Sequence, residues 1–101
     1  MTEAEIEHKL VEFCRRNGLL TYKFTSPSSR GVPDRIIIGR DRLLFLELKQ
    51  YKKKPTVIQQ HEMTRINAHA GTRVKADWAD CYAKAIDLIV EFFFLNPDSI
   101  R

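Results

Sequence analysis

The chain has 101 residues, of which 30% are charged and 44% hydrophobic, a composition typical of one compact domain. Seventeen Lys and Arg against thirteen Asp and Glu give a net charge of +4, which permits nucleic-acid binding without requiring it. The longest apolar run, 86–95, contains Asp87 and Glu91 and is too short to span a membrane. Two cysteines cannot form a disulfide framework. We therefore expect a single soluble domain over residues 1–101, located in the cytoplasm, which is that of a bacterial host if a phage encodes the chain.

Hydrophobic spacing and turn residues divide the chain into helices and strands without an internal repeat. In chain order we expect a helix (2–16), a short strand (19–24), a loop rich in Ser and Pro (25–31), a strand hairpin (34–38 and 43–49), a helix (57–70), a strand (73–76) and a helix (79–94). The first helix opens with Thr2 and, three residues later, Glu5, which is the pattern of a capping box. The hairpin, with its aliphatic residues, is expected to form the centre of the fold.

Charged side chains interrupt the apolar hairpin at three positions. Asp34 opens the first strand, and Glu47 and Lys49 share one face of the second because side chains alternate along a strand. Leu48 turns into the core, but its backbone carbonyl stays available as an oxygen ligand. Alternating charges are common on exposed strands, but the strand around Glu47 is too apolar to be mostly exposed, and unpaired buried charges are costly. The pattern therefore favours a functional site over a solvated surface.

Two carboxylates beside a lysine suit one kind of chemistry. A hard divalent cation held by Asp34 and Glu47 neutralises a scissile phosphate and activates water for phosphodiester hydrolysis. Lys49 either orients or deprotonates that water, or stabilises the developing negative charge. The negative charge of Glu47 favours the protonated lysine, which weakens the role of a base.

These motifs resemble the VRR-NUC family of the PD-(D/E)xK nuclease superfamily, in its stand-alone phage and prophage form. The similarity rests on the segment 31–34, on 47–49, on the glutamine that follows and on 23–27. It implies a restriction-endonuclease-like three-layer α/β/α fold with a mixed central sheet flanked by helices. It also implies a cofactor, Mg²⁺ or Mn²⁺, DNA endonuclease activity and a homodimer.

The resemblance also assigns roles to individual residues. The predicted catalytic residues are Asp34, Glu47, Lys49, Gln60 and Glu7. The predicted metal ligands are Asp34, Glu47, Glu7 and the backbone carbonyl of Leu48.

Two of these assignments have a competitor nearby. Glu3 lies on nearly the same helical face as Glu7; Glu7 is preferred because it lies closer to the apolar stripe and farther from the fraying helix end. Gln59 competes with Gln60, which is preferred because its spacing places it on the inward side with Met63. Gln59 is expected to be more peripheral.

Basic and polar residues outside the hairpin are candidates for contact with DNA phosphates. They are Lys23, Ser26, Arg30, Lys52, Lys53 and Lys54. The alternative interpretation is an ordinary polar loop and a solvated turn. Trp78 is expected to anchor the core or an interface rather than to stack on a base.

The segment 92–95 is apolar on every side of the last helix, which predicts self-association. A two-fold homodimer covers this patch and places two active sites on one nucleic acid. The alternative is that the tail packs against its own sheet.

The favoured function is a metal-dependent DNA endonuclease that is specific for structure, acting on branched, flap or Holliday-junction-like DNA in repair or recombination. The chain is too small to include a base-reading module, so sequence-specific restriction is less favoured. The alternative is a non-catalytic nucleic-acid-binding module that keeps the fold and the basic loop. A third hypothesis is an assembly subunit that uses its C-terminal aromatic residues and has no salt-dependent affinity for DNA. No membrane and no small-molecule cofactor are expected.

Overall fold

The computed structural model describes residues 1–96 and residue 98. The predicted domain extends to residue 101, so its residues 97 and 99–101 lie outside the described part. In chain order the elements are α1 (Glu3–Arg16), β1 (Leu20–Lys23), β2 (Arg35–Gly39), β3 (Arg42–Leu48), α2 (Val57–His69), β4 (Val74–Ala79) and α3 (Tyr82–Phe92). This is the predicted order of elements. No helix among the described residues is long and apolar enough to cross a membrane.

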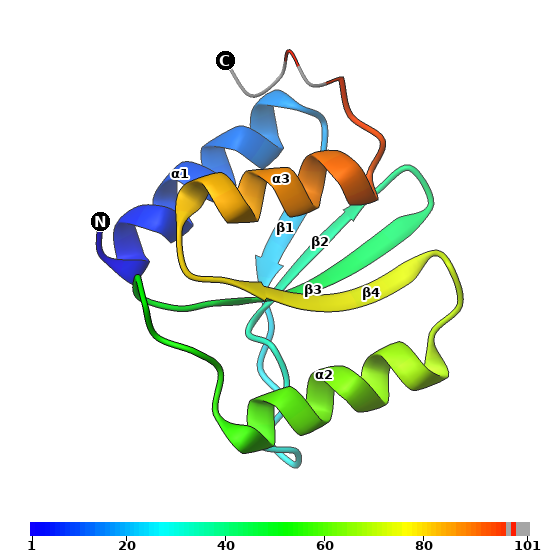
Figure 1. Ribbon diagram of the computed structural model, residues 1–101. Coiled ribbons are helices and arrows are strands. Elements are labelled where there is room, and N and C mark those ends of the chain that lie inside the picture. The colour runs from blue at the N-terminus through cyan, green and yellow to red at the C-terminus, as the bar shows by residue number, and fades with distance from the viewer. Residues whose placement is uncertain (97, 99–101) are drawn as a thin grey trace.

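The four strands form a mixed sheet in the order β1-β2-β3-β4. The pairs β1/β2 and β2/β3 are antiparallel, and β3/β4 is parallel. The predicted hairpin is confirmed, and its turn uses Arg40 and Asp41 with φ of 50° and 60°, the left-handed backbone that matches the twist of a tight hairpin. Figure 1 shows α1 and α3 over one face of the sheet and α2 below the other. The predicted three-layer α/β fold is confirmed.

The main core lies between the sheet and the pair α1 and α3. Its largest fully buried side chains include Ile6, Leu10, Phe13, Ile37, Leu44, Leu46, Ile86 and Ile89. The even-numbered residues of β3 therefore point toward α1 and α3, and the odd-numbered residues point toward α2. The predicted capping box at Thr2 is confirmed at the start of α1, and Thr56 forms a second capping box with Gln59 at the start of α2.

Two predicted boundaries near the C-terminal end are wrong. The last strand runs on to Ala79 because Trp78 and Ala79 pair with Glu47 and Leu48 of β3. The last helix consequently begins at Tyr82 and not at residue 79. Pairing with a neighbouring strand here outweighs the local helical spacing.

The apolar tail packs on its own domain, which overturns the reason given for self-association. Phe92, Phe93 and Leu95 are buried, and Phe94 alone of this group is exposed, at 70%. Phe94 has a left-handed backbone (φ 53°), and the N–H of Leu95 donates to the carbonyl of Val90. The chain therefore turns back after α3 and covers the end of the core.

The outer edge of β4 is closed by side chains. The amide of Asn67 donates to the carbonyl of Ala76 at 2.9 Å and accepts from the N–H of Ala76 at 2.8 Å. The carboxylate of Asp77 accepts from the N–H of Trp78 at 2.8 Å. Capping the free backbone groups of an edge strand prevents pairing with another chain.

We expect Asn67→Ala to lower the free energy of unfolding by about 1 to 2 kcal/mol, because both hydrogen bonds to Ala76 are lost. Urea denaturation followed by circular dichroism measures the change. Asn67→Asp keeps the acceptor but loses the donor, so its stability should lie between that of the wild type and that of Asn67→Ala. Equal stability of Asn67→Ala and the wild type would show that water replaces the amide at no cost.

Candidate active site

The predicted catalytic residues of the hairpin meet at one end of the sheet. Asp34 directly precedes β2, and Glu47 lies one residue before the end of β3. Leu46 and Leu48 are buried in the core, so Glu47 between them points to the face that α2 covers. The Nζ atom of Lys49 lies 3.9 Å from the carboxylate of Glu47. The structure thus brings together an acid and a lysine at the end of β3, with Asp34 at the start of β2.

The surroundings of Glu47 disfavour its charged form. The residue is only 5% exposed, and burial raises its pKa to about 7. The negative charges of Asp34 and Glu3 also raise this pKa, whereas the positive charge of Lys49 and the N–H of Asp34 lower it. Crowded carboxylates with a raised pKa are typical of sites that bind a cation or transfer protons.

The two candidate acids on α1 have different surroundings. The guanidinium of Arg35, which is 5% exposed, donates to the carboxylate of Glu7 at 2.9 Å, and the ammonium of Lys23 lies 3.3 Å from it. Glu7 therefore neutralises a buried arginine on the core face of the sheet. Glu3, one turn earlier, is the acid of this helix whose charge raises the pKa of Glu47. The sequence signal for this arrangement is Arg35 itself, whose side chain alternates away from Asp34.

The two candidate glutamines also differ. Gln59 belongs to the capping box of α2, where its side chain accepts from the N–H of Thr56 at 2.9 Å. The side chain of Gln60 donates to the carbonyl of Pro55 at 2.8 Å. Gln60 is exposed and Gln59 is half-buried, so the expectation that Gln59 is the more peripheral is wrong. Gln60 nevertheless lines the space between α2 and β4 together with Met63, as its spacing along the helix predicts.

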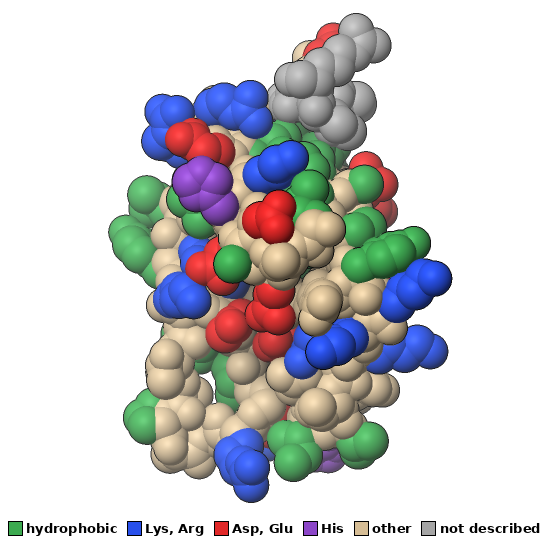
Figure 2. Space-filling view, turned by 90° about the vertical axis from the view of Figure 1, so that its left-hand side faces the viewer, with side chains coloured by type: hydrophobic (Ala, Val, Ile, Leu, Met, Phe, Trp, Pro, Cys, Tyr) green, Lys and Arg blue, Asp and Glu red, His purple; other side chains and the backbone are tan. Residues whose placement is uncertain are grey.

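The predicted DNA-contacting residues lie at or close to the surface. Lys52, Lys53, Lys54 and Arg30 are exposed, and Ser26 is half-buried. Lys23 is exposed but pairs with Glu7. Figure 2 shows Asp and Glu side chains in the middle of one face of the molecule, with Lys and Arg side chains around them.

A close contact joins the loop before Asp34 to helix α2. Gly31 has a left-handed backbone (φ 84°), and a Cβ atom at this position would lie 2.6 Å from the side chain of Ile58. Only glycine allows the loop to lie this close to the first turn of α2. The contact holds the entrance of β2 next to the helix with the two glutamines.

Comparisons with known proteins identify a similar sequence and a similar structure. No model of a known protein family matches the chain. A protein of Acyrthosiphon pisum secondary endosymbiont phage 1, described as "Putative nuclease p44", is 42% identical over 67 residues, which are 65% of this chain and 72% of the phage protein. The chain belongs to the family of this phage protein. A solved structure described as a VRR_NUC domain matches it with a TM-score of 0.76 and 21% identity, over 88% of this chain and 96% of the other.

The resemblance to phage-type VRR-NUC proteins is therefore confirmed, and the fold is that of the VRR-NUC domain. The likeness to the solved structure concerns the fold.

The donor atoms of this site fit a hard cation. Within residues 1–96 and 98, no group of three or more His, Cys, Asp and Glu side chains is arranged to hold a metal ion. The repulsion between Asp34 and Glu47 nevertheless falls when a cation lies between them, and oxygen ligands suit Mg²⁺ or Mn²⁺. Water and substrate oxygens usually complete the coordination of Mg²⁺, so two carboxylates from the protein are enough to bind it.

The backbone of β3 supplies another oxygen at this place. The N–H of Lys49 donates to the carbonyl of Ala79 on β4, and the backbone groups of successive residues point to opposite sides of a strand. The carbonyl of Leu48 therefore points to the β2 side. The pairing of β2 with β3 ends at Arg35 and Leu46, so this carbonyl lies beyond the ladder, on the side of Asp34.

The raised pKa of Glu47 predicts a pH dependence of stability in metal-free buffer. Between about pH 4.5 and 7 the folded protein holds a proton at Glu47 that the unfolded chain has released, so stability falls as the pH rises through this range. Glu47→Gln should lack this loss. Urea denaturation in EDTA at several pH values from about 5 to 8 measures the difference; parallel curves for variant and wild type would contradict the raised pKa.

Proposed function

We propose that this chain is a Mg²⁺- or Mn²⁺-dependent deoxyribonuclease. Its Asp34, Glu47 and Lys49 would form the site that hydrolyses phosphodiester bonds. The observation that carries the proposal is the buried Glu47, whose pKa is raised to about 7 beside a second carboxylate and a lysine. Membership in the family of a phage protein described as a nuclease supports it. A structural ion pair has no use for a second carboxylate, whereas Mg²⁺ sites commonly use one or two carboxylates together with water.

Each residue of the site has a distinct proposed role. A bound divalent cation supplies charge neutralisation at the scissile phosphate and activation of the attacking water. Asp34 and Glu47 would hold that cation, together with the carbonyl of Leu48. The Nζ atom of Lys49 lies 3.9 Å from the carboxylate of Glu47, and Lys49 would orient the water or stabilise the negative charge that develops on the phosphate.

The acid contributed by α1 is proposed to be Glu3 rather than Glu7. Glu3 adds to the negative field at Glu47, whereas Glu7 is committed to Arg35 and Lys23. Withdrawing Glu7 toward a metal would leave the buried guanidinium of Arg35 without its acidic partner, which is costly. Gln60 or Gln59 is proposed to complete the site from α2.

DNA is the proposed substrate, with branched, flap or Holliday-junction-like DNA preferred. Phosphates would contact the exposed basic residues near the acidic centre (Figure 2). The proposed contacts are Lys23, Ser26, Arg30, Lys52, Lys53 and Lys54. Homodimerisation stays a prediction, and exposed apolar residues such as Phe94, and Leu20 and Tyr22 on edge strand β1, support it.

Replacing the central residues should abolish cleavage. We expect Asp34→Asn and Lys49→Ala to lower the cleavage rate about 100-fold or more, because the cation loses a ligand or the phosphate loses a charge. Labelled duplex, flap and four-way-junction DNA with Mg²⁺, Mn²⁺ or EDTA provide the assay. Lys9→Ala, on the exposed face of α1, is the matched control and should cut normally.

Cleavage that persists in EDTA, or that both variants retain, would refute this assignment. Binding of DNA without cleavage of any substrate by the folded wild type would instead establish the alternative, a non-catalytic nucleic-acid-binding module.

The two acids of α1 can be separated by a pair of variants. Glu3→Gln should reduce cleavage about tenfold or more with little change in stability, because Glu3 is exposed. Glu7→Gln should lower the free energy of unfolding by about 1 to 3 kcal/mol, because Arg35 is left without a charged partner, while the folded fraction still cuts. Cleavage rates and urea denaturation of both variants measure this, and the reverse pattern would assign the metal to Glu7.

A further inference from the structure

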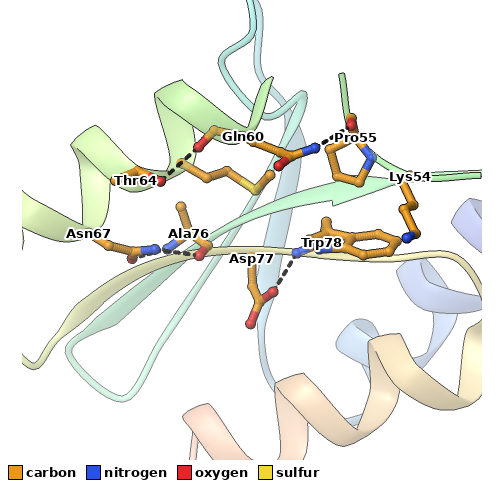
Figure 3. Close-up of a pocket in the computed structure, with 9 residues that line it drawn as sticks. Lys54, Pro55, Gln60, Thr64, Asn67, Ala76, Asp77 and Trp78 are labelled. Carbon is orange, nitrogen blue, oxygen red and sulfur yellow. Dashed lines mark hydrogen bonds between the residues drawn. The ribbon is translucent and has the colours of Figure 1, made fainter. Parts of the chain in front are cut away.

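An open cavity lies between α2 and the edge strand β4 (Figure 3). Its volume is about 410 Å³, and its lining includes Lys54, Gln60, Met63, Thr64 and Trp78. Met63 is buried and forms an apolar wall. The cavity therefore combines an aromatic ring, an apolar wall, an amide and a cation.

The cavity lies next to the proposed active site. Trp78 on β4 is directly opposite Glu47 on β3 in the register of the sheet, and neighbouring strands are about 4.8 Å apart. Directly opposite residues project to the same face of a sheet, so the Trp78 side chain starts beside the carboxylate of Glu47. A group that enters the cavity would thus belong to a molecule that also reaches the site.

The Trp78 ring has one face covered. The ammonium of Lys84 lies 3.5 Å from the ring centre. Lys84 belongs to α3, which is on the opposite side of the sheet from α2 (Figure 1). The lysine therefore approaches from the side away from α2 and leaves the ring face toward α2 to border the cavity. A held aromatic ring with one open face is a stacking platform.

Polar groups at the cavity have unused capacity. The side-chain amide of Gln60 donates one hydrogen bond to the carbonyl of Pro55. Its amide oxygen accepts no hydrogen bond from the part of the chain that the structure describes. Lys54 is exposed and has no acidic partner within that part. The nearby carboxylate of Asp77 pairs with Lys75 at 3.3 Å and points away from Gln60 (Figure 3). The free charge at the cavity is therefore positive.

The edge of β4 excludes one class of occupant. An added peptide strand needs free backbone groups on an edge strand. The backbone groups of Ala76 are taken by Asn67, and the N–H of Trp78 is taken by Asp77. The occupant must instead be a flat group that stacks, offers a polar edge and is attached to an anion, which describes a nucleotide.

We propose that this cavity holds one unstacked nucleobase of the DNA substrate. The base stacks on the open face of Trp78, Gln60 contacts its polar edge, and Lys54 contacts a neighbouring phosphate. The inference rests on the proposed nuclease function and deepens it, because it specifies a substrate with an unpaired nucleotide close to the cleaved bond. Extruding a paired base costs energy, so strands that are already unpaired are favoured.

Trp78 is the single tryptophan of the chain, so its fluorescence reports on the cavity directly. The wild type is titrated in EDTA, where the proposed cleavage cannot proceed, with a single-stranded DNA oligonucleotide and with a wholly abasic backbone of equal length. We expect the base-bearing strand to quench the emission and to bind about tenfold more tightly than the abasic strand. Equal affinity and equal quenching by the two strands would overturn the proposal.

A cavity-filling variant provides an independent readout. Thr64 lines the cavity, whereas Ala68, one turn further along α2, is exposed and is not part of its lining. Thr64→Phe should bind the base-bearing strand about tenfold more weakly, and Ala68→Phe should bind it like the wild type. Undiminished binding and quenching in a folded Thr64→Phe variant would also overturn the base site.

The binding experiment separates this inference from the function on which it rests. Loss of the base preference while Asp34-dependent cleavage is retained refutes the base site and leaves the nuclease standing. Base-dependent quenching without cleavage under any metal supports the site and refutes the nuclease.

Discussion

The period-two alternation of β3 is the constraint on which the rest of the structure depends. β3 has neighbours on both sides, with β2 antiparallel and β4 parallel. Its leucines at 44, 46 and 48 fill the core under α1 and α3, so Glu47 must face the other way, toward the side of the sheet that α2 covers. The same packing that stabilises the domain thereby holds a carboxylate out of water. A shift of β3 by one residue would turn the leucines out of the core and Glu47 into it, so both the core and the site would be lost.

Helix α1 combines a structural and a chemical function along one face. Glu7 is bound by the buried Arg35, which places the helix against the start of β2. Glu3, one turn nearer the N-terminus, contributes to the field at Glu47. Arg35 and Asp34 are neighbours in the chain but point to opposite faces of the sheet. The ion pair on the core face therefore positions the strand whose first residue carries the proposed ligand on the other face.

Local patterns allowed most of the fold to be predicted from the sequence. The capping box at Thr2 and the tight hairpin depend on residues within a few positions of each other. The end of β4 and the turn at Phe94 depend on partners distant in sequence, so spacing alone misplaced them. Periodicity alone also does not separate the paired acids of α1 or the paired glutamines of α2, and these site assignments stay predictions. Each depends on which neighbour, such as Arg35, already occupies a side chain.

Because Gly31 contacts Ile58, the geometry of the site depends on helix α2 as well as on the sheet. Asp34 follows this glycine by three residues, so the hairpin alone does not set the position of its carboxylate. A displacement of the first turn of α2 would press on the loop and change the separation of Asp34 from Glu47. The helix that borders the proposed nucleobase cavity therefore also contacts the loop that leads to one of the two carboxylates.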